Sequence, residues 1–343
     1  MIDKLETLKK LLPGAQENVP LKNYTTFGIG GPAKLFYRVK ATEDLVRTAN
    51  LCRQLKVDFF ILGGGSNTLF SDEGFSGLVV KNEASEIEIL EGNKIKAASG
   101  ILNPLLVNFC KNAGLTGTEF LAGIPGTFGG AIRHNARFRD PRSFLEYFTD
   151  FHEVKDNFIG DLVEKVRLLL PNGRTVWRGK RYCQFGYESS GLRSAFKKKN
   201  DIILEAVLKL KKADPKKIAK AIEMIIIWRQ TRSAAGKTRK EDPFTGSLSP
   251  QPQGKSAGCV FSNTKNKWNH PAGRMIDMAG LKGKRVGGAK ISELHANFII
   301  NDKNASARDV IKLIKLAKAA VKKKFGVELK EEINFVGFEK HPV

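Results

Sequence analysis

The sequence lacks any hydrophobic run of membrane-spanning length and any secretory signal. Its longest strongly apolar run, MIIIW at residues 224–228, is far shorter than the roughly 18 residues that a membrane span requires. The opening residues, MIDKLETLKKLLPG, include acidic side chains and lack an apolar core followed by a small-residue cleavage site. We therefore expect a cytoplasmic protein that makes no membrane contact.

Cysteine is scarce and scattered. The four cysteines stand alone in the sequence, at Cys52, Cys110, Cys183 and Cys259. There is no C-x-x-C pair and no neighbouring pair of histidines, which are the spacings typical of zinc sites. The pattern therefore argues against a disulfide scaffold and predicts no metal centre.

Negative charge is also in short supply, because the net charge is +23 at pH 7. Such an excess can serve nucleic acid or small anionic ligands. The lysines form short groups spread over the chain, without interleaved aromatic residues or a recognisable nucleic-acid-binding motif. We therefore expect no nucleic-acid partner, and a basic nucleic-acid-associated protein is kept as a third hypothesis.

The pattern of apolar residues predicts a mixed α/β protein of two or three domains. Strand-like runs between residues 33 and 112 alternate with helical stretches at 42–55 and 103–112. A lysine-rich boundary near 209–217 precedes a helix at 215–229. In the last part, a helix that begins at Ser306 and ends at Gly326 is expected to cover a second α/β domain.

The remaining predictions of secondary structure concern the second half of the chain. Residues 231–258 are charged and rich in glycine, serine and proline, which predicts a mobile loop, with a lid as one interpretation. A helix is expected near 271–279, and strands near 286–290 and 297–301. The last strand is expected near 327–336.

Three consecutive glycines, Gly63, Gly64 and Gly65, follow an apolar run and precede Ser66 and Asn67. Glycines let the backbone turn through positive φ and expose several N–H groups, which suits a phosphate or diphosphate. No Gly-Lys-Ser/Thr sequence closes the cluster, so it is not a Walker A loop. The following residues contain further glycines and a strand-like run rather than a helix, so a Rossmann loop fits poorly as well.

A second glycine-rich segment, GIPGTFGGAIRHNA, occupies residues 123–136. Its proline and threonine suit the start of a helix whose free N–H groups can bind an anion. Either segment alone is more often a tight turn. Two of them in one half of a chain favour a cofactor that carries phosphate.

Eight motifs together resemble one known family. They are, in order, TFGIGGPA, ILGGGSNTLFSDEGFSGLVV, GIPGTFGGAIRHNA, CQFGY, SAGCVFSN, AGRMIDMAGLKG, VGGAKISELHANFIIN and LKEEINFVG. This set resembles the UDP-N-acetylenolpyruvoylglucosamine reductase (MurB) family over residues 23–337, nearly the whole chain. The HANFIIN ending is similar to the second subclass of that family.

The resemblance implies a fold and its domain limits. The fold is the two-part FAD-binding fold of the vanillyl-alcohol oxidase (PCMH) type with a smaller C-terminal α/β substrate-binding domain. The implied division is a helical extension at 1–22, an FAD-binding domain at 23–211 and a substrate-binding domain at 212–343. A monomer is expected.

The resemblance further implies that the protein uses non-covalent FAD, with NADPH as hydride donor, to reduce a UDP-sugar enolpyruvate during peptidoglycan precursor synthesis. Both glycine segments would then lie along the cofactor. The implied cofactor-binding residues are Gly63, Gly64, Gly65, Ser66, Asn67, Gly123, Ile124, Pro125, Gly126, Thr127, Gly129, Gly130 and Asn135.

Two residues of the C-terminal motifs match the catalytic positions of the family. Cys259 stands where the family has serine or cysteine, which implies that it donates a proton to the substrate carbon, and a thiol with a reference pKa of about 8.5 is protonated at neutral pH. Glu332 matches the glutamate that stabilises the charge on the substrate carboxylate. Asn263 and Tyr187 are the implied substrate contacts. Without the resemblance, a lone cysteine would be read as a buried apolar residue and Glu332 as a solvated one.

The sequence departs from the family at the arginine that holds the substrate carboxylate, because Glu188 occupies that position. An active enzyme therefore needs a cation from elsewhere, with Arg137 as first choice and Arg193 as second. The alternative hypothesis is a flavoprotein of the same fold with lost or changed activity.

Overall fold

The computed structural model describes residues 4–138, 157–186, 190–192, 201–234, 252, 254–263 and 266–343. The chain divides into two compact units that alternate along the sequence. Unit 1 consists of Met1–Gly14, Tyr37–Gly64 and Val80–Ile227, and unit 2 of Ala15–Phe36, Gly65–Val79 and Trp228–Val343. The boundary passes through strands β2 (Pro32–Val39) and β5 (Phe75–Asn82), which belong to a sheet of strand order β1-β2-β5-β3, and through helix α8 (Pro215–Ala234).

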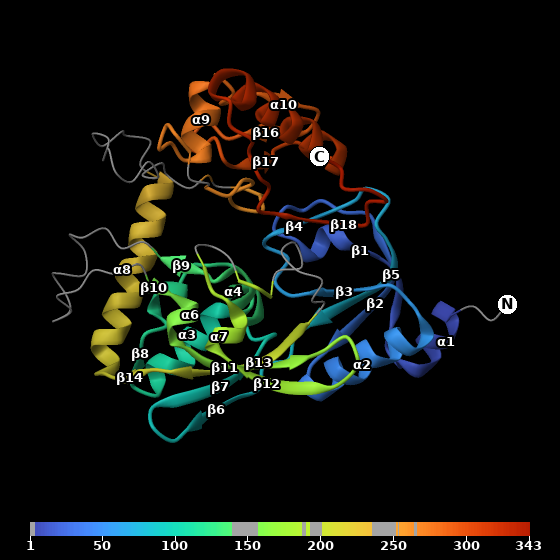
Figure 1. The fold of residues 1–343 in the computed structure, drawn as a ribbon, viewed down its shortest axis with the longest axis vertical. Coiled ribbons are helices and arrows are strands. Elements are labelled where there is room, and N and C mark those ends of the chain that lie inside the picture. The colour runs from blue at the N-terminus through green and yellow to red at the C-terminus, as the bar shows by residue number, and fades with distance from the viewer. Residues whose placement is uncertain are drawn as a thin grey trace. The chain divides into compact units, whose positions relative to one another are not determined.

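Unit 1 is built on a five-stranded antiparallel sheet of strand order β12-β11-β13-β7-β6 (Figure 1). Its strands are β6 (Ile87–Leu90), β7 (Lys94–Ala98), β11 (Val163–Leu169), β12 (Thr175–Gly179) and β13 (Ile202–Lys209). All residues from Ile203 to Leu208 in the central strand are buried, so both faces of the sheet are covered there. Helices α2 (Thr42–Leu55) and α4 (Phe128–His134) pack against this strand.

Helix α2 follows the apolar spacing of its sequence. Leu45, Ala49 and Cys52 recur at helical intervals and are fully buried, and Lys56 ends the helix in the left-handed conformation with φ 52°. The predicted helix at 42–55 is confirmed. Helix α3 (Asn103–Asn112) likewise confirms the predicted helix at 103–112.

The remaining elements of unit 1 are short. They are α1 (Lys4–Leu11), β3 (Phe59–Leu62), β8 (Leu115–Thr116), η2 (Glu119–Leu121), β9 (Arg137–Phe138), β10 (Asn157–Phe158), α6 (Ile159–Leu162), α7 (Lys180–Cys183) and β14 (Lys211–Lys212). Strand β3 leads into the first glycine segment, and the second glycine segment leads into α4.

Unit 2 is organised around the long helix α10 (Ala307–Phe325), which packs against the strands β15 (Arg285–Val286) and β16 (Ala289–Ile291). Ser306 and Asp309 form a capping box at its start, and Gly326 ends it with φ 68°. The face toward the core consists of Val310, Leu313, Ile314, Ala317, Val321 and Phe325, all buried. The predicted helix and its cap at Ser306 are thus confirmed.

The other elements of unit 2 include a parallel strand pair. They are β1 (Gln16–Pro20), η1 (Leu21–Tyr24), β4 (Thr68–Phe70), α9 (Ala272–Met278), β17 (Ile299–Asn301) and β18 (Asn334–Val336). Strand β4 pairs with β18 in the register Thr68↔Asn334. Residues just after the first glycine segment therefore lie beside residues just after Glu332.

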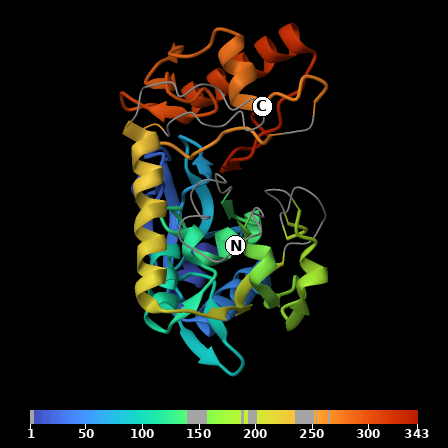
Figure 2. The ribbon, with the colours of Figure 1, turned by 90° about the vertical axis from the view of Figure 1, so that its left-hand side faces the viewer.

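Three sequence predictions need correction. Helix α8 runs to Ala234 rather than to 229 (Figure 2), because no glycine or proline interrupts the chain before Gly236. The predicted loop at 231–258 therefore begins inside this helix, and most of that segment lies outside the described residues. The expected strand at 286–290 is a hairpin, since Gly287 turns the chain with φ 52°. The last strand is confined to Asn334–Val336.

Among the helices of the described residues, none is long and apolar enough to span a bilayer.

Candidate functional site

The first glycine segment, residues 63–65, follows β3 directly and belongs to a crowded turn. A Cβ on Gly63 would lie 2.6 Å from Oγ1 of Thr127, and a Cβ on Gly64 would lie 2.5 Å from Cα of Gly126. Gly65 has φ 66°, and a Cβ there would meet the carbonyl oxygen of Tyr24. Glycine suits these positions because the side chain of Thr127 and the backbone of Gly126 and Tyr24 occupy the space that a Cβ would take.

The second glycine segment also depends on backbone conformations that favour glycine. Gly123 has φ 74° and Gly126 has φ 121°. Thr127 caps helix α4 by accepting a hydrogen bond at Oγ1 from the N–H of Gly130, at 3.4 Å. Gly129 donates to the carbonyl oxygen of Ser99 at 2.8 Å.

The two segments of unit 1 form one cradle, which we call the glycine cradle and define as residues 63–64 with residues 123–130. In the described part of the chain, the N–H groups of Gly64, Gly126 and Thr127 donate no hydrogen bond to the backbone. Backbone N–H groups gathered in this way are the donors that a diphosphate needs. The residues present therefore fit a cofactor that carries a diphosphate.

Asn103, the first residue of α3, holds the second glycine segment and was not found from the sequence. Its backbone N–H donates to Gly126 at 3.1 Å, and its Nδ2 donates to the carbonyl oxygen of Ile124 at 3.3 Å. Its Oδ1 is buried and has no hydrogen-bond partner among the described residues. A buried acceptor of this kind is able to accept a hydrogen bond from water or from a ligand. An asparagine just before a proline at a helix start was the only available signal.

Lys81 of β5 holds the first glycine segment and was also missed. Its Nζ donates to the carbonyl oxygen of Gly63. Burial lowers the pKa of Lys81 below its ordinary value, while Glu83 acts in the opposite direction. A lysine inside the apolar run GLVVKN was the signal that could have revealed it.

Asn135 and Asn67 were predicted to contact FAD, and the structure shows protein contacts for both. The side chain of Asn135 donates to Gly186 at 2.7 Å and accepts from Gly160 at 2.9 Å. The side chain of Asn67 donates to the backbone carbonyl oxygen of Glu332 at 3.2 Å. The backbone carbonyl oxygen of Asn67 accepts from the N–H of Asn334 at 2.9 Å. Cofactor contacts of these residues and of Ser66 stay predictions.

The two predicted catalytic residues lie on neighbouring extended segments of unit 2. Phe261 forms an antiparallel bridge with Glu331, and the N–H of Glu332 donates to the carbonyl oxygen of Val260 at 2.7 Å. The backbone of Glu332 is therefore one residue away from that of Cys259. Both side chains are partly exposed.

Cys259 differs from the other cysteines in its exposure. The remaining three, Cys52, Cys110 and Cys183, are buried, and burial raises their thiol pKa values to about 12, 11 and 11. Cys259 is partly accessible, as a thiol that donates a proton to a ligand must be.

A buried asparagine positions the segment that carries Cys259. Asn297 accepts from the N–H of Phe261 at 2.9 Å and donates to its carbonyl oxygen at 2.8 Å through one side-chain amide. Its backbone oxygen accepts from Val260 at 2.8 Å. We call this arrangement the Asn297 clamp. A polar residue in the apolar stretch ANFII was its signal in the sequence.

The predicted substrate-binding residues and cations have different outcomes. Asn263 accepts from the N–H of Ala272 at 3.0 Å and so caps helix α9, and its substrate contact stays a prediction. Arg137 is partly buried in β9, where it pairs with Phe158. Tyr187, Glu188 and Arg193 lie outside the described residues.

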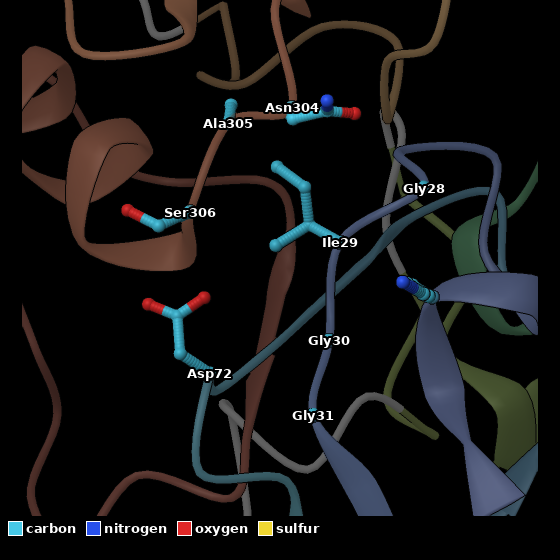
Figure 3. A pocket seen from close by; sticks show the side chains of 9 residues that line it. Gly28, Ile29, Gly30, Gly31, Asp72, Asn304, Ala305 and Ser306 are labelled. Carbon is cyan, nitrogen blue, oxygen red and sulfur yellow. The ribbon is translucent and has the colours of Figure 1, made fainter.

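A separate cavity of about 330 Å³ lies in unit 2, at the start of helix α10 (Figure 3). The carboxylate of Asp72 accepts from Ala307 at 2.7 Å and from Arg308 at 3.1 Å, and it thereby supplies the acceptors that the helix start requires. The one acidic side chain lining this cavity is therefore already used to stabilise the helix.

Comparison with known proteins identifies the class of protein to which this fold and cradle belong. Residues 33–138 match the model of the FAD binding domain, which includes both glycine segments. Residues 250–336 match the model of the UDP-N-acetylenolpyruvoylglucosamine reductase C-terminal domain, which includes Cys259, Asn263 and Glu332. The protein is a flavoprotein of the FAD-dependent oxidoreductase class, and the predicted fold class is confirmed.

The chain belongs to the UDP-N-acetylenolpyruvoylglucosamine reductase family. It is 36% identical to the reductase of Caldanaerobacter subterraneus subsp. tengcongensis over 98% of both chains. It is 35% identical to the reductase of Protochlamydia amoebophila over 94% of both chains. The crystal structure of the reductase (MurB) from Thermus caldophilus matches 93% of this chain and 98% of that chain, with 32% identity and a TM-score of 0.68.

Proposed function

We propose that this protein reduces UDP-N-acetylglucosamine enolpyruvate to UDP-N-acetylmuramate with NADPH and FAD, in peptidoglycan precursor synthesis. The observation that carries the proposal is the pairing of two segments within the matched C-terminal domain. Across this pairing the N–H of Glu332 donates to the carbonyl oxygen of Val260, the residue that follows the partly exposed Cys259. The glycine cradle would hold FAD, which would supply the transfer of a hydride from NADPH to the vinyl carbon of the substrate.

The chain's own residues complete the reaction. Hydride addition at the vinyl carbon leaves negative charge on the neighbouring carbon and its carboxylate, which Glu332 stabilises in its protonated form by donating a hydrogen bond. Cys259 then gives its thiol proton to that neighbouring carbon. Asn263 and Tyr187 hold the UDP-sugar. We further propose that the protein acts as a monomer.

Glu188 requires a cation elsewhere, and we propose Arg137 for this role because it closely follows the second glycine segment. Two unit charges about 4 Å apart interact by roughly 4 kcal/mol at an effective dielectric near 20, so an uncompensated glutamate would oppose carboxylate binding strongly. Arg137→Ala should abolish the substrate half-reaction, whereas Glu188→Ala should leave it nearly unchanged. If Arg137→Ala behaves like wild type, Arg193→Ala is the next variant to test, and wild-type behaviour of both refutes the relocation of the charge.

The alternative is a flavoprotein whose activity has changed because of Glu188. The relatives named above carry the name of the reductase, so the comparisons lend this alternative no support.

The deciding experiment measures two steps separately. The purified protein should be yellow, release its flavin on acid precipitation, and become reduced by NADPH. Addition of the enolpyruvyl substrate should then reoxidise the flavin and sustain NADPH consumption. Flavin reduction by NADPH without substrate-dependent turnover would contradict the proposal and favour the changed activity. A protein that neither retains nor rebinds FAD would contradict both.

A further inference from the structure

We propose that Lys81 and Asn103 form the rear wall of the glycine cradle and orient its backbone N–H groups toward the diphosphate of FAD. The inference rests on the use of FAD in the proposed function and goes beyond it by assigning two residues outside both glycine motifs. Both residues act through the backbone that they hold, so they are positioning residues.

Lys81 and Asn103 donate hydrogen bonds to three carbonyl oxygens of the cradle. Lys81 holds the carbonyl oxygen of Gly63, and Asn103 holds those of Ile124 and Gly126. These three carbonyl groups are therefore directed toward the two side chains and the start of α3.

Peptide planarity then fixes the direction of the N–H groups. In a trans peptide the C=O group and the following N–H point in opposite directions. The Gly63 carbonyl directed at Lys81 therefore turns the N–H of Gly64 away from Lys81. The Gly126 carbonyl directed at Asn103 likewise turns the N–H of Thr127 away from Asn103.

The N–H groups of Gly64 and Thr127 lie close together and make no backbone hydrogen bond within the described residues. Gly64 lies against Gly126, the residue before Thr127, so closely that a Cβ would be 2.5 Å from its Cα. The N–H groups of Gly64 and Thr127 are thus neighbouring donors without a backbone acceptor, which is the arrangement that a diphosphate oxygen needs.

Charge supports the same assignment. The side chain of Lys81 is partly buried, and its ammonium group donates a hydrogen bond to Gly63. A partly buried positive charge directly behind the turn favours an anion in front of it, because the low dielectric of the interior weakens the field less than water does. Asn103 contributes no charge, but its buried Oδ1 accepts no hydrogen bond from the described residues.

The test measures FAD affinity rather than turnover. Protein stripped of flavin is titrated with FAD, and the dissociation constant is followed by flavin fluorescence, while the unfolding midpoint of the flavin-free protein reports its fold. Lys81→Met should bind FAD at least about tenfold more weakly, since hydrogen bonds to a charged group are among the strong ones. Lys81→Arg, which keeps the charge and a donor, should stay within about threefold of wild type.

Two matched control variants test whether a loss of FAD affinity is specific to Lys81 and Asn103. Lys96→Met removes a lysine of β7 that pairs with Glu88 at 2.6 Å and should leave FAD affinity unchanged. Asn103→Asp replaces the donor to Ile124 with an oxygen that repels this carbonyl group. Because Pro125 has no N–H, the change acts by displacing the segment that carries Thr127, and it should weaken FAD binding about tenfold. Asn108→Asp, on an exposed position of the same helix, should have no effect.

The outcomes are decisive for this proposal. FAD affinity of Lys81→Met and Asn103→Asp equal to that of wild type would overturn it, and so would an equal loss in Lys81→Arg and Lys81→Met. Should Lys81→Met fail to fold, Lys81→Gln takes its place, since it keeps a donor without the charge. A wild type that binds FAD tightly but does not reduce the enolpyruvyl substrate would refute the proposed function. The FAD affinities of the Lys81 and Asn103 variants would still test whether these residues orient the cradle.

Discussion

The glycine cradle of unit 1 and the Cys259 segment of unit 2 are built by different means. In the cradle, backbone meets backbone, as when Gly64 lies against Gly126, and the groups offered to a ligand are peptide N–H groups. In unit 2 the Asn297 clamp fixes an extended segment through side-chain hydrogen bonds, and the groups offered are a thiol and a carboxylate.

This difference separates two kinds of damage. A change in the cradle alters the space and donors available to FAD, so it should impair every step that uses the flavin. A change near Cys259 leaves the cradle intact, so it should impair only the step that consumes the enolpyruvyl substrate. Separate measurement of flavin reduction by NADPH and of flavin reoxidation by substrate tests this division.

The largest expected effect is at Cys259. Cys259→Ala removes the proposed proton donor and should slow flavin reoxidation by substrate about a thousandfold, within the usual contribution of general acid catalysis. Flavin reduction by NADPH should remain near the wild-type rate, and Cys259→Ser should retain substantial activity. Equal losses in the two half-reactions would instead identify a structural cysteine and break the comparison.

The next effect concerns the cradle itself. Gly64→Ala places a Cβ against Gly126 where backbone cannot move aside, and overpacking of this kind costs about 1–3 kcal/mol. FAD affinity should therefore fall up to about a hundredfold, and both half-reactions should decline together at limiting FAD.

The control for this variant is Gly179→Ala. No atom lies within 4 Å of a Cβ at Gly179, and its φ of −72° suits any residue. Gly179→Ala should leave FAD binding unchanged. Selective loss of the substrate half-reaction in Gly64→Ala would show that the cradle does not act on the flavin as a whole.

A smaller loss is expected from the clamp. Asn297→Asp keeps the size of the side chain but turns its donor toward Phe261 into an oxygen that repels the carbonyl group. Because a buried unsatisfied group costs about 1–3 kcal/mol, we expect reoxidation by substrate to fall about tenfold to a hundredfold, with flavin reduction unchanged. Asn172→Asp, at an exposed turn, is the control. Unchanged reoxidation in Asn297→Asp would show that the clamp does not position Cys259.

The two regions also differ in how much of their structure and function could be predicted from the sequence. Helices such as α2 and α10 were predicted closely, because local apolar spacing and caps determine them. The glycine segments could be recognised because only glycine tolerates their backbone conformations and close contacts. The roles of Cys259 and Glu332 came from the family resemblance, since neither residue stands out by its type.

The contacts that hold these groups were not predictable, because they join residues far apart in the chain. Lys81 reaches Gly63, Asn103 reaches Ile124, and Asn297 reaches Phe261. A lysine or asparagine is usually a surface residue, so its sequence position alone does not indicate a buried contact. The length of the last strand was overestimated for a related reason. Glu331 pairs with Phe261 through an isolated bridge, and the strand itself is limited to residues 334–336.

The smallest expected effect links pH to the clamp through His295. Burial lowers the pKa of this imidazole to about 4, and the positive charge of Lys282 acts in the same direction. Its neutral Nδ1 accepts from the N–H of Asn297 at 3.2 Å. The unfolded chain takes up this proton near pH 6.5, whereas the folded protein resists it down to about pH 4. The free energy of unfolding should therefore fall as pH drops through this window, by roughly 1–3 kcal/mol. His295→Gln should remove that part of the pH dependence between pH 7.5 and 5, measured by denaturant unfolding, whereas His341→Gln at the exposed C-terminal end should not. If both variants keep the wild-type pH dependence, protonation of His295 does not weaken unit 2, and the clamp is independent of pH in this range.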